Sequence, residues 1–515
     1  MRIFVRANQA GVTAPSVRVR LYNGATLTTT QTLTAPMPTA PTTISEASLT
    51  QSWNFTIPGG SIQPGLGVLL DADPTSVVAE ADETNNLWPA SGSPMVMDVR
   101  NLMTFRGTLV PITQNSLTGD ATAGNLASWY AKFQNMFPVA PGMDLLLGAP
   151  YTTTQVLLSS GGGWGNLLSE LEAKRVVEAS SRYYYGAVKV SYSSGVAGIG
   201  YVPLASSSQG RTALGWDKST GFADGGLYFD VLTHETGHNM GRAHSPCGGA
   251  GQPDPGYPYP GALIGIYGLD VAAMTLKDPG VYTDIMAYCS PVWISDYVFS
   301  SILDLRQASP IGIAPPQDAG QPAMATTMQD CLLITGRIHN GNVELEPALQ
   351  VRTIPTAVDG KARRGSRILE GRAASGQVLF RHLLPVTEVA EDIPGSHDQH
   401  FIAAVPVDNL IAGQLRELRV MGDAGVEALR WSSNAMPLRS GAVQVPQARI
   451  SGEGEISLTW DAGAHPLVMV RDAATGEVLS FAKGGVLVLK TRAKNLELTL
   501  SSGVASERLS LKLSE

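Results

Sequence analysis

The pattern of apolar and polar positions divides the chain into three kinds of segment. Residues 1 to about 88 alternate apolar and polar side chains in short runs such as "SVRVRLYNG" and "SWNFTIPGG", separated by loops rich in Thr, Pro and Gly. Alternation with a period of two is typical of strands that bury one face. The pattern therefore predicts an all-β module at the N-terminus, which we place at 1–95.

The middle of the chain mixes helical and strand-like patterns. The run "WGNLLSELEAKRVVEASS" from Trp164 has the length and composition of a helix. "AVKVSYS" from Ala187 and "AGIGYVP" from Ala197 are typical of strands. This mixture predicts an α+β domain over 96–309.

Strand-like segments return after the Pro-rich stretch "SPIGIAPPQDAGQPAMATT", which is typical of an extended connector and predicts a linker over 310–325. "LLITGRIHNGNVELEPALQV" and "EISLTWDAGAHPLVMVRDAATGEVLSFA" are strand pairs punctuated by Gly, Asn and Asp turns. They predict two β-sandwich domains, over 326–438 and 439–515. The expected fold class is a multidomain protein in which all-β sandwiches flank an α+β domain.

Composition and charge indicate which classes of binding partner to expect. The 515-residue chain is 43% hydrophobic and 16% charged, which is typical of a globular protein, and its net charge is -8. No run of Lys or Arg is long enough to follow a phosphate backbone, so we expect no nucleic-acid partner. No apolar stretch approaches the roughly 20 residues that span a bilayer, so we expect no membrane insertion. No leader segment is visible, and the strand-like opening is more typical of the middle of a domain.

The most informative stretch is "HETGHNMGRAH", which begins at His234. On a helix, His234 and His238 lie on one face, where two imidazole nitrogens can bind one metal ion. Glu235 lies about 100° further round the helix axis, near enough to hydrogen-bond a metal-bound water. Gly241 can adopt the left-handed conformation that ends a helix, so that His244 returns as a third ligand. Three histidines leave zinc one open position, as in catalytic sites.

The alternative is a polar helix without a shared role. Chance would produce all five fixed positions in on the order of one protein in a hundred thousand of this composition, which argues against it. The stretch resembles the signature H-E-x-x-H-x-x-G-x-x-H of the metzincin zinc proteases, whose methionine turn follows downstream. The resemblance, to bacterial metzincins of the reprolysin-like or gametolysin-like kind, implies a twisted mixed sheet with an active-site helix.

The methionine turn is present in "YTDIMAYCSPVWISDY", where Met286 stands 42 residues after the third histidine. By resemblance, Met286 packs beneath the zinc ligands as a hydrophobic floor. Tyr288 follows in the spacing of branches whose tyrosine reaches the metal or the transition state, and a packed core tyrosine is the alternative. "GIGYVP" lies where metzincins carry the edge strand that pairs with substrate, which assigns peptide binding to Gly200 and Tyr201. A plain internal strand is the alternative there.

The three cysteines permit at most one internal disulfide. Cys247 stands three residues after the third histidine and Cys289 three after the methionine, so a metzincin-like fold brings both near the floor of the cleft. We expect a disulfide between them, which implies export, with Cys331 as the odd thiol.

The N-terminal module ends in "VVAEADETNNLWP", which resembles the closing hairpin of bacterial cell-adhesion-related β-sandwich domains; an acidic turn in any β-domain is the alternative. The β-domains are thus candidates for binding an extracellular polymer or a cell surface. "DADPTS" and "WDKSTGFADGG" offer oxygen ligands for Ca²⁺, but neither has a recognised calcium-loop spacing.

These features predict a secreted zinc-dependent metalloendopeptidase that takes protein or glycoprotein substrates. One catalytic zinc ion would activate a water molecule, with Glu235 as the general base. Two alternatives stay open: an adhesion or matrix-binding protein with a vestigial zinc domain, and a zinc hydrolase of cell-wall amides. The intact Glu235 and His244 argue against the first, and the extended signature with its methionine turn argues against the second.

Overall fold

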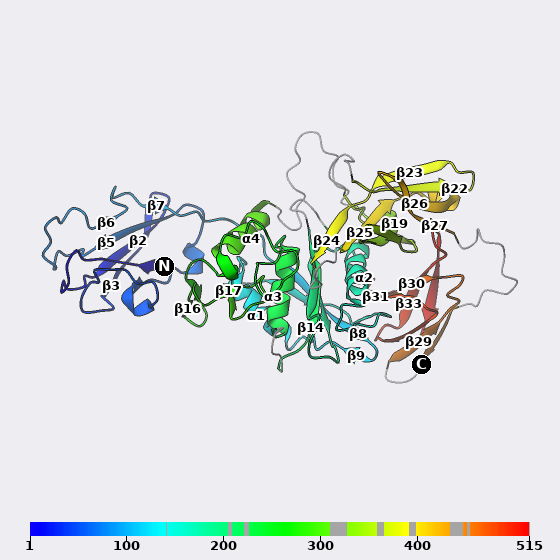
Figure 1. Cartoon of the computed structure of the whole chain (residues 1–515), viewed down its shortest axis with the longest axis horizontal. Coiled ribbons are helices and arrows are strands. Elements are labelled where there is room, and N and C mark those ends of the chain that lie inside the picture. Colours follow the sequence, from blue (N-terminus) through cyan, green and yellow to red (C-terminus); the bar gives the residue numbers. More distant parts are fainter. Residues whose placement is uncertain are drawn as a thin grey trace. The chain divides into compact units, whose positions relative to one another are not determined.

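The computed structural model describes most of the chain (Figure 1). The described residues are 1–140, 142–203, 209–220, 226–308, 327–357, 365–390, 398–432, 446–450 and 454–513. The chain divides into two compact units, of which the first is 1–103 with 263–282 and the second is 104–262 with 283–515. The predicted linker over 310–325 and the predicted boundary near 438 lie outside the described residues, and the boundary at 95 stays a prediction.

The first unit is a β-structure whose core comes from alternating side chains. Its main sheet has the strand order β3-β2-β5-β6, with β7 also paired to β5. In β2 (Val17–Asn23), the side chains of Val17, Val19 and Leu21 are buried, as the alternation predicts. Trp53 adds to this core, and its indole N–H donates to the carbonyl of Pro15 at 3.1 Å. The other strands of the unit are β1 (Arg2–Ile3), β3 (Thr26–Leu33), β4 (Trp53–Asn54), β5 (Leu66–Ala72), β6 (Leu87–Trp88), β7 (Met95–Val96), β15 (Gly268–Asp270) and β16 (Thr275–Lys277).

The second unit is built on one mixed sheet of twelve strands. In its first half β10, β8, β12 and β14 lie side by side and parallel, and β13 runs antiparallel to β14. The sheet then continues through β24, β25, β19 and β20, which come from the downstream part of the chain. Its strands are β8 (Arg106–Gln114), β9 (Leu117–Thr118), β10 (Asp144–Leu147), β11 (Tyr151–Thr152), β12 (Tyr183–Val188), β13 (Gly198–Val202), β14 (Thr212–Trp216), β19 (Gln329–His339), β20 (Asn342–Leu345), β21 (Leu349–Thr353), β24 (Val386–Ala390) and β25 (Asp398–Pro406).

Helices α2 and α3 lie on opposite faces of this sheet (Figure 1). Leu214 and Gly215 are neighbours in β14, so their side-chain positions point to opposite faces. A Cβ atom on Gly186 would meet both Leu214 and Leu171 of α2, whereas one on Gly215 would meet Val231 of α3 at 2.7 Å. Helix α1 packs beside α3. The helices are α1 (Leu126–Met136), α2 (Trp164–Val177), α3 (Tyr228–Asn239), α4 (Asp296–Ala308) and α5 (Asn409–Gln414), and none is long and apolar enough to cross a bilayer, as far as the described residues go.

Three smaller sheets complete the downstream part of the second unit. Their orders are β23-β22-β26-β27, β28-β29-β32 and β31-β30-β33-β34. Alternation again builds the core: Leu496, Leu498 and Leu500 of β33 are all buried. The strands are β22 (Ile368–Ala373), β23 (Val378–Leu383), β26 (Leu415–Gly422), β27 (Gly425–Trp431), β28 (Gln447–Ile450), β29 (Glu455–Thr459), β30 (Leu467–Asp472), β31 (Val478–Ala482), β32 (Val486–Lys490), β33 (Asn495–Ser501) and β34 (Ser506–Lys512). The expected class, an α+β domain flanked by all-β structure, is confirmed.

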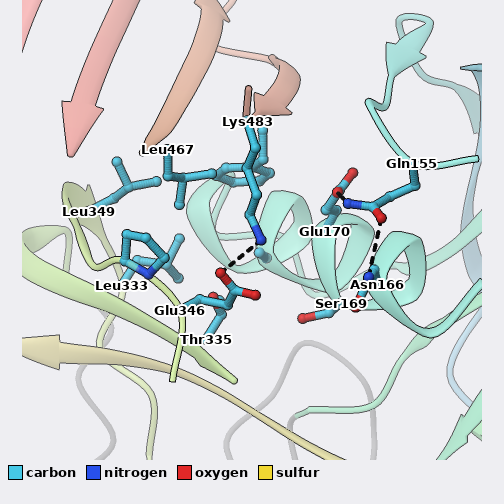
Figure 2. Close-up of a pocket in the computed structure, with 13 residues that line it drawn as sticks. Gln155, Asn166, Ser169, Glu170, Leu333, Thr335, Glu346, Leu349, Leu467 and Lys483 are labelled. Carbon is cyan, nitrogen blue, oxygen red and sulfur yellow. Dashed lines mark hydrogen bonds and ion pairs between the residues drawn. The ribbon is translucent and has the colours of Figure 1, made fainter. Parts of the chain in front are cut away.

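The downstream sheets close over helix α2. The buried ammonium of Lys174 donates to the carbonyl of Val478 in β31 at 2.8 Å. A small cavity of about 50 Å³ lies between α2, β19 and the end of β31 (Figure 2). Lys483 pairs with Glu346 across it at 2.8 Å, and Glu170 of α2 lines its wall. The downstream strands thus cover α2 on the face of the sheet opposite α3.

Candidate metal centre and active site

Helix α3 carries His234 and His238, and the turn that ends the helix brings His244 back toward them. At its start, the carboxylate of Asp230 accepts a hydrogen bond from the N–H of Leu227 at 2.9 Å, which caps the first turn. At its end, Gly241 adopts a φ of 74°, and its N–H donates to the carbonyl of His238 at 2.8 Å. Glycine takes this left-handed conformation without strain. The chain therefore reverses at Gly241, and His244 follows three residues later.

His234, His238 and His244 are buried and direct their Nε2 atoms at one another. The Nε2 of His238 lies 3.1 Å from that of His234 and 3.1 Å from that of His244. Each Nδ1 lies within hydrogen-bonding distance of a backbone carbonyl, which favours the tautomer that leaves the Nε2 lone pair free for a metal. The carbonyls are those of Ile285, 2.8 Å from His234, Arg242, 2.6 Å from His238, and Gly251, 2.6 Å from His244.

Burial keeps these imidazoles neutral. It lowers the pKa of His234 from 6.5 to about 3, with nearby His244 adding to the shift. Burial, followed by the two neighbouring histidines, lowers the pKa of His238 well below its usual value, and burial lowers the pKa of His244. Neutral imidazole nitrogens are zinc ligands, and Zn–N bonds of about 2.0–2.1 Å place tetrahedral ligands roughly 3.3 Å apart. The three ligand atoms, all within 4.8 Å of one another, fit such an ion.

Glu235 lies beside these ligands, buried between α3 and β13. A Cβ atom on Gly198 would lie 2.6 Å from the Oε1 of Glu235. A Cβ atom on Gly200 would lie 2.9 Å from the carbonyl oxygen of Glu235 and 3.3 Å from the Cβ of His238. The two glycines therefore let the strand lie directly against the helix. The sequence contains this signal as Gly-x-Gly in "GIGYVP", because alternate strand positions share one face.

Met286 and Tyr288 approach the histidines from the methionine turn. Met286 is fully buried, and its sulfur faces Gly237, where any side chain would collide with it. Since Gly237 immediately precedes His238 in α3, the methionine packs under the helix at the level of the ligands. The hydroxyl of Tyr288 lies 3.0 Å from the Nε2 of His244. It therefore points into the region where the three ligand atoms meet.

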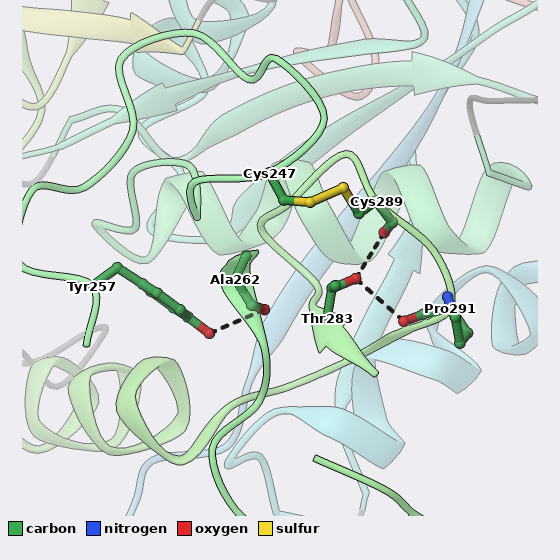
Figure 3. Close-up of a disulfide and its surroundings, with 6 residues drawn as sticks. All are labelled: Cys247, Tyr257, Ala262, Thr283, Cys289 and Pro291. Atoms are coloured by element: carbon green, nitrogen blue, oxygen red, sulfur yellow. Dashed lines mark hydrogen bonds between the residues drawn. A yellow bond between two sulfur atoms is a disulfide. The ribbon is translucent and has the colours of Figure 1, made fainter. Parts of the chain in front are cut away.

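A disulfide joins Cys247 to Cys289, with their Cα atoms 5.7 Å apart (Figure 3). Backbone hydrogen bonds run beside it between the same two segments. The N–H of Ser245 donates to the carbonyl of Met286 at 2.9 Å, and the N–H of Tyr288 donates to the carbonyl of Cys247 at 3.2 Å. The segment after the third histidine and the methionine turn are thus held together covalently and by hydrogen bonds.

The methionine turn lies between two short parallel strands, β17 (Thr283–Asp284) and β18 (Val292–Trp293). The hydroxyl of Thr283 lies 2.9 Å from the carbonyl oxygen of Cys289 and 3.2 Å from that of Pro291, which anchors the turn (Figure 3). Asp284, the next residue, is a fully buried acid that sequence reasoning missed. The sequence feature that could have indicated it is the single acidic residue in "TDIMA", a run of five residues that are all buried in the structure.

The predicted substrate edge at Gly200 and Tyr201 needs a correction, because both residues already pair with β24. One side of β13 pairs with β14, and the other pairs antiparallel with β24, where Gly200 lies opposite Ala390 and Tyr201 opposite Val389. The backbone groups that an extended peptide would use are therefore taken by the chain itself. The buried hydroxyl of Tyr201 also lies 2.7 Å from the Nδ1 of His400 in β25.

Two further expectations concern the odd thiol and calcium. Cys331 of β19 is a free, buried cysteine. Part of the oxygen-rich segment 216–226 lies outside the described residues. Within the described ranges, the three histidines form the only group of three or more His, Cys, Asp or Glu side chains placed to hold a metal ion.

A match to a known family falls on the segment that contains the three histidines. None of the curated proteins matches the chain. Among solved structures, a segment of two fibronectin type III domains from chicken tenascin matches with 12% identity, covering 38% of this chain and 98% of its own, at a TM-score of 0.13. The model of a family described as metallo-peptidase family M12B, reprolysin-like, matches residues 173–245, which contain α3 and all three histidines. In this segment the chain is similar to the reprolysin-like metallopeptidases.

Proposed function

We propose that the chain is a secreted zinc-dependent metalloendopeptidase that acts on protein or glycoprotein substrates. The observation that carries the proposal is the convergence of three neutral Nε2 atoms, with the buried Glu235 next to His234 on the same helix. The match of residues 173–245 to reprolysin-like metallopeptidases supports it. The disulfide between Cys247 and Cys289 supports export, because such bonds persist in oxidising compartments.

His234, His238 and His244 would hold the ion. When bound, zinc supplies a Lewis acid that polarises the scissile carbonyl and makes the attacking water more acidic. Glu235 accepts the proton from that water and passes it to the leaving amine. The hydroxyl of Tyr288, 3.0 Å from the Nε2 of His244, donates a hydrogen bond to the carbonyl oxygen as negative charge develops there.

The proposal does not include a substrate strand at Gly200 and Tyr201. Gly200 pairs with both β14 and β24, and Tyr201 pairs with β24, so an extended peptide can add at these two residues only after β24 has left them. The substrate must otherwise reach Glu235 without pairing with Gly200 and Tyr201.

The test is the Glu235→Gln variant of the full chain, compared with Glu170→Gln as a matched control. Both replace a glutamate by its amide, but Glu170 is half-buried and lies on α2, which covers the opposite face of the sheet. We expect Glu235→Gln to keep its zinc, measured by elemental analysis, and to lose activity by about 10²- to 10⁴-fold on casein and on a mucin-type glycoprotein. Glu170→Gln should keep its activity.

Three outcomes would contradict the proposal. Wild-type rates for Glu235→Gln would remove its role as general base. Cleavage of cell-wall fragments alone by the wild-type protein would favour the amide hydrolase. A wild-type protein that binds zinc and cleaves none of these substrates would favour the adhesion protein with a vestigial zinc domain.

A further inference from the structure

Asp284 is a buried acid whose carboxylate is held by neutral hydrogen-bond donors. Its Oδ1 accepts hydrogen bonds from the N–H of Met286 at 2.8 Å and from the hydroxyl of Ser245 at 3.1 Å. Its Oδ2 accepts from the N–H of Ser295 at 2.8 Å. Burial raises the pKa of Asp284, and the hydrogen bonds from these donors oppose that rise. Since a buried acid is tolerated only while such donors stay in place, the carboxylate and its donors fix one another's positions.

The hydrogen bond from Met286 connects Asp284 to one zinc ligand, His234. The N–H of Met286 and the carbonyl of Ile285 belong to one planar peptide group. Asp284 holds the N–H end of this group at 2.8 Å, and the carbonyl end lies 2.8 Å from the Nδ1 of His234. Any rotation of the peptide plane would therefore break both contacts together. Asp284 thus sets the orientation of the carbonyl that holds the His234 ring.

The hydrogen bond from Ser245 connects Asp284 to another ligand, His244. Ser245 follows His244 directly, and its hydroxyl donates to Asp284 at 3.1 Å. Its N–H donates to the carbonyl of Met286 at 2.9 Å, so Ser245 is tied to the methionine turn at two points. The backbone that carries His244 is therefore anchored to the same carboxylate as the peptide group that holds His234.

We propose that Asp284 is a positioning residue that fixes His234 and His244 for the metal ion, through one peptide group and one serine hydroxyl. The inference rests on the proposed function, because it assumes that the three histidines bind zinc. It adds a residue outside the zinc signature, placed on the methionine turn, to the determinants of metal affinity.

The test compares Asp284→Asn with Glu172→Gln in the full chain. Asparagine keeps the size of the side chain, but its amide nitrogen cannot accept a hydrogen bond, so at least one donor loses its partner. Glu172 is the matched control, because it is fully buried and also accepts from three groups, Arg175, Thr212 and the N–H of Gly210, on the α2 side of the sheet. Zinc affinity is measured by competition with a chromogenic chelator, ligand geometry by the absorption spectrum of the Co²⁺-loaded protein, and stability by thermal unfolding of the metal-free protein.

We expect Asp284→Asn to bind zinc 10- to 100-fold more weakly and to shift the cobalt spectrum, as changes in groups that orient metal ligands do. Glu172→Gln should lower stability and leave both metal readouts unchanged. Ser245→Ala removes only the hydrogen bond from the serine hydroxyl to Asp284, so it should weaken zinc binding by a smaller factor. If Asp284→Asn does not fold, the zinc affinity of Ser245→Ala tests the proposal.

Wild-type zinc affinity in Asp284→Asn, or equal weakening by Asp284→Asn and Glu172→Gln, would show that Asp284 is structural only. Wild-type affinity in Ser245→Ala would remove the link to His244. A wild-type chain that binds no zinc would instead overturn the proposed function, so the two failures are distinguishable.

Discussion

Replacing His400 by glutamine should flatten the pH dependence of stability below about pH 6.5. His400 is almost fully buried in β25, and its Nδ1 lies 2.7 Å from the hydroxyl of Tyr201 in β13. Its ring also lies against α2, since a Cβ atom on Gly165 would be 3.7 Å from it. Burial lowers the pKa of His400 from 6.5 to about 4. The folded chain therefore keeps this ring neutral at pH values where the unfolded chain protonates it.

The direction and size of the effect follow from that difference in pKa. Because the pKa is lower in the folded protein, the stability that depends on neutral His400 is fully present above pH 6.5 and is lost as the pH falls toward 4. One pKa unit corresponds to about 1.4 kcal/mol, so His400 should account for roughly 3 kcal/mol of unfolding free energy lost over this range. Glutamine does not titrate, and this share of the pH dependence should disappear in the variant.

The assay is urea unfolding of the metal-free full chain at several pH values between 7 and 4. The other ionisable groups are the same in the variant and the wild type, so the difference between them isolates His400. Tyr201→Phe is the companion variant: it removes the hydrogen bond, which should cost about 1–3 kcal/mol, but leaves His400 buried and the pH dependence in place. If His400→Gln retains the wild-type slope, burial between β13 and α2 does not hold His400 neutral.

Substitutions around the metal centre test separately the disulfide, the packing of β13 on α3 and the role of Tyr288. Cys247→Ser opens a disulfide between residues 42 positions apart and should lower the unfolding free energy by about 4 kcal/mol in urea titrations; reducing the wild-type protein should reproduce the loss, and an unchanged midpoint would contradict it. Gly200→Ala should lower the free energy of unfolding by about 1–3 kcal/mol and weaken zinc binding, because its Cβ would lie 2.9 Å from the carbonyl oxygen of Glu235. Gly413→Ala is the control: its Cβ would meet no atom within 4 Å, so zinc binding should not change. Tyr288→Phe should lower kcat by about 10²-fold with zinc content unchanged, and a wild-type kcat would place Tyr288 outside the reaction.

The convergence of the three histidines could be predicted because its geometry is encoded within eleven residues. A spacing of four on a helix puts His234 and His238 on one face, and a glycine that ends the helix lets His244 return. The pairing of Cys247 with Cys289 needed more than this, since a separation of 42 residues does not by itself determine a contact. There the prediction depended on the resemblance of the methionine turn.

The pairing of β13 with β24 could not be predicted from local pattern. Gly200 and Ala390 pair although they lie 190 residues apart in the sequence. Alternation of apolar residues determines which face of a strand is buried, but it does not determine which strand lies beside it. Asp284 was missed for a related reason: a single buried acid has no period, and only the folded turn shows which donors it holds.

Helix α2 shows why the downstream strands belong to the same folding unit as the metal centre. Its sequence contains Glu172, Lys174 and Arg175, which would be expected in solvent on an isolated domain. All three are buried, and Lys174 donates to the carbonyl of Val478 in β31. Leu333 of β19 belongs to the same buried cluster as the apolar side chains of α2, so a chain ending at 309 would expose that cluster to water. β19, which packs against α2, belongs to the same sheet as β24, the strand that pairs with Gly200 and Tyr201. The pairing at these two residues is therefore a consequence of completing the core around α2.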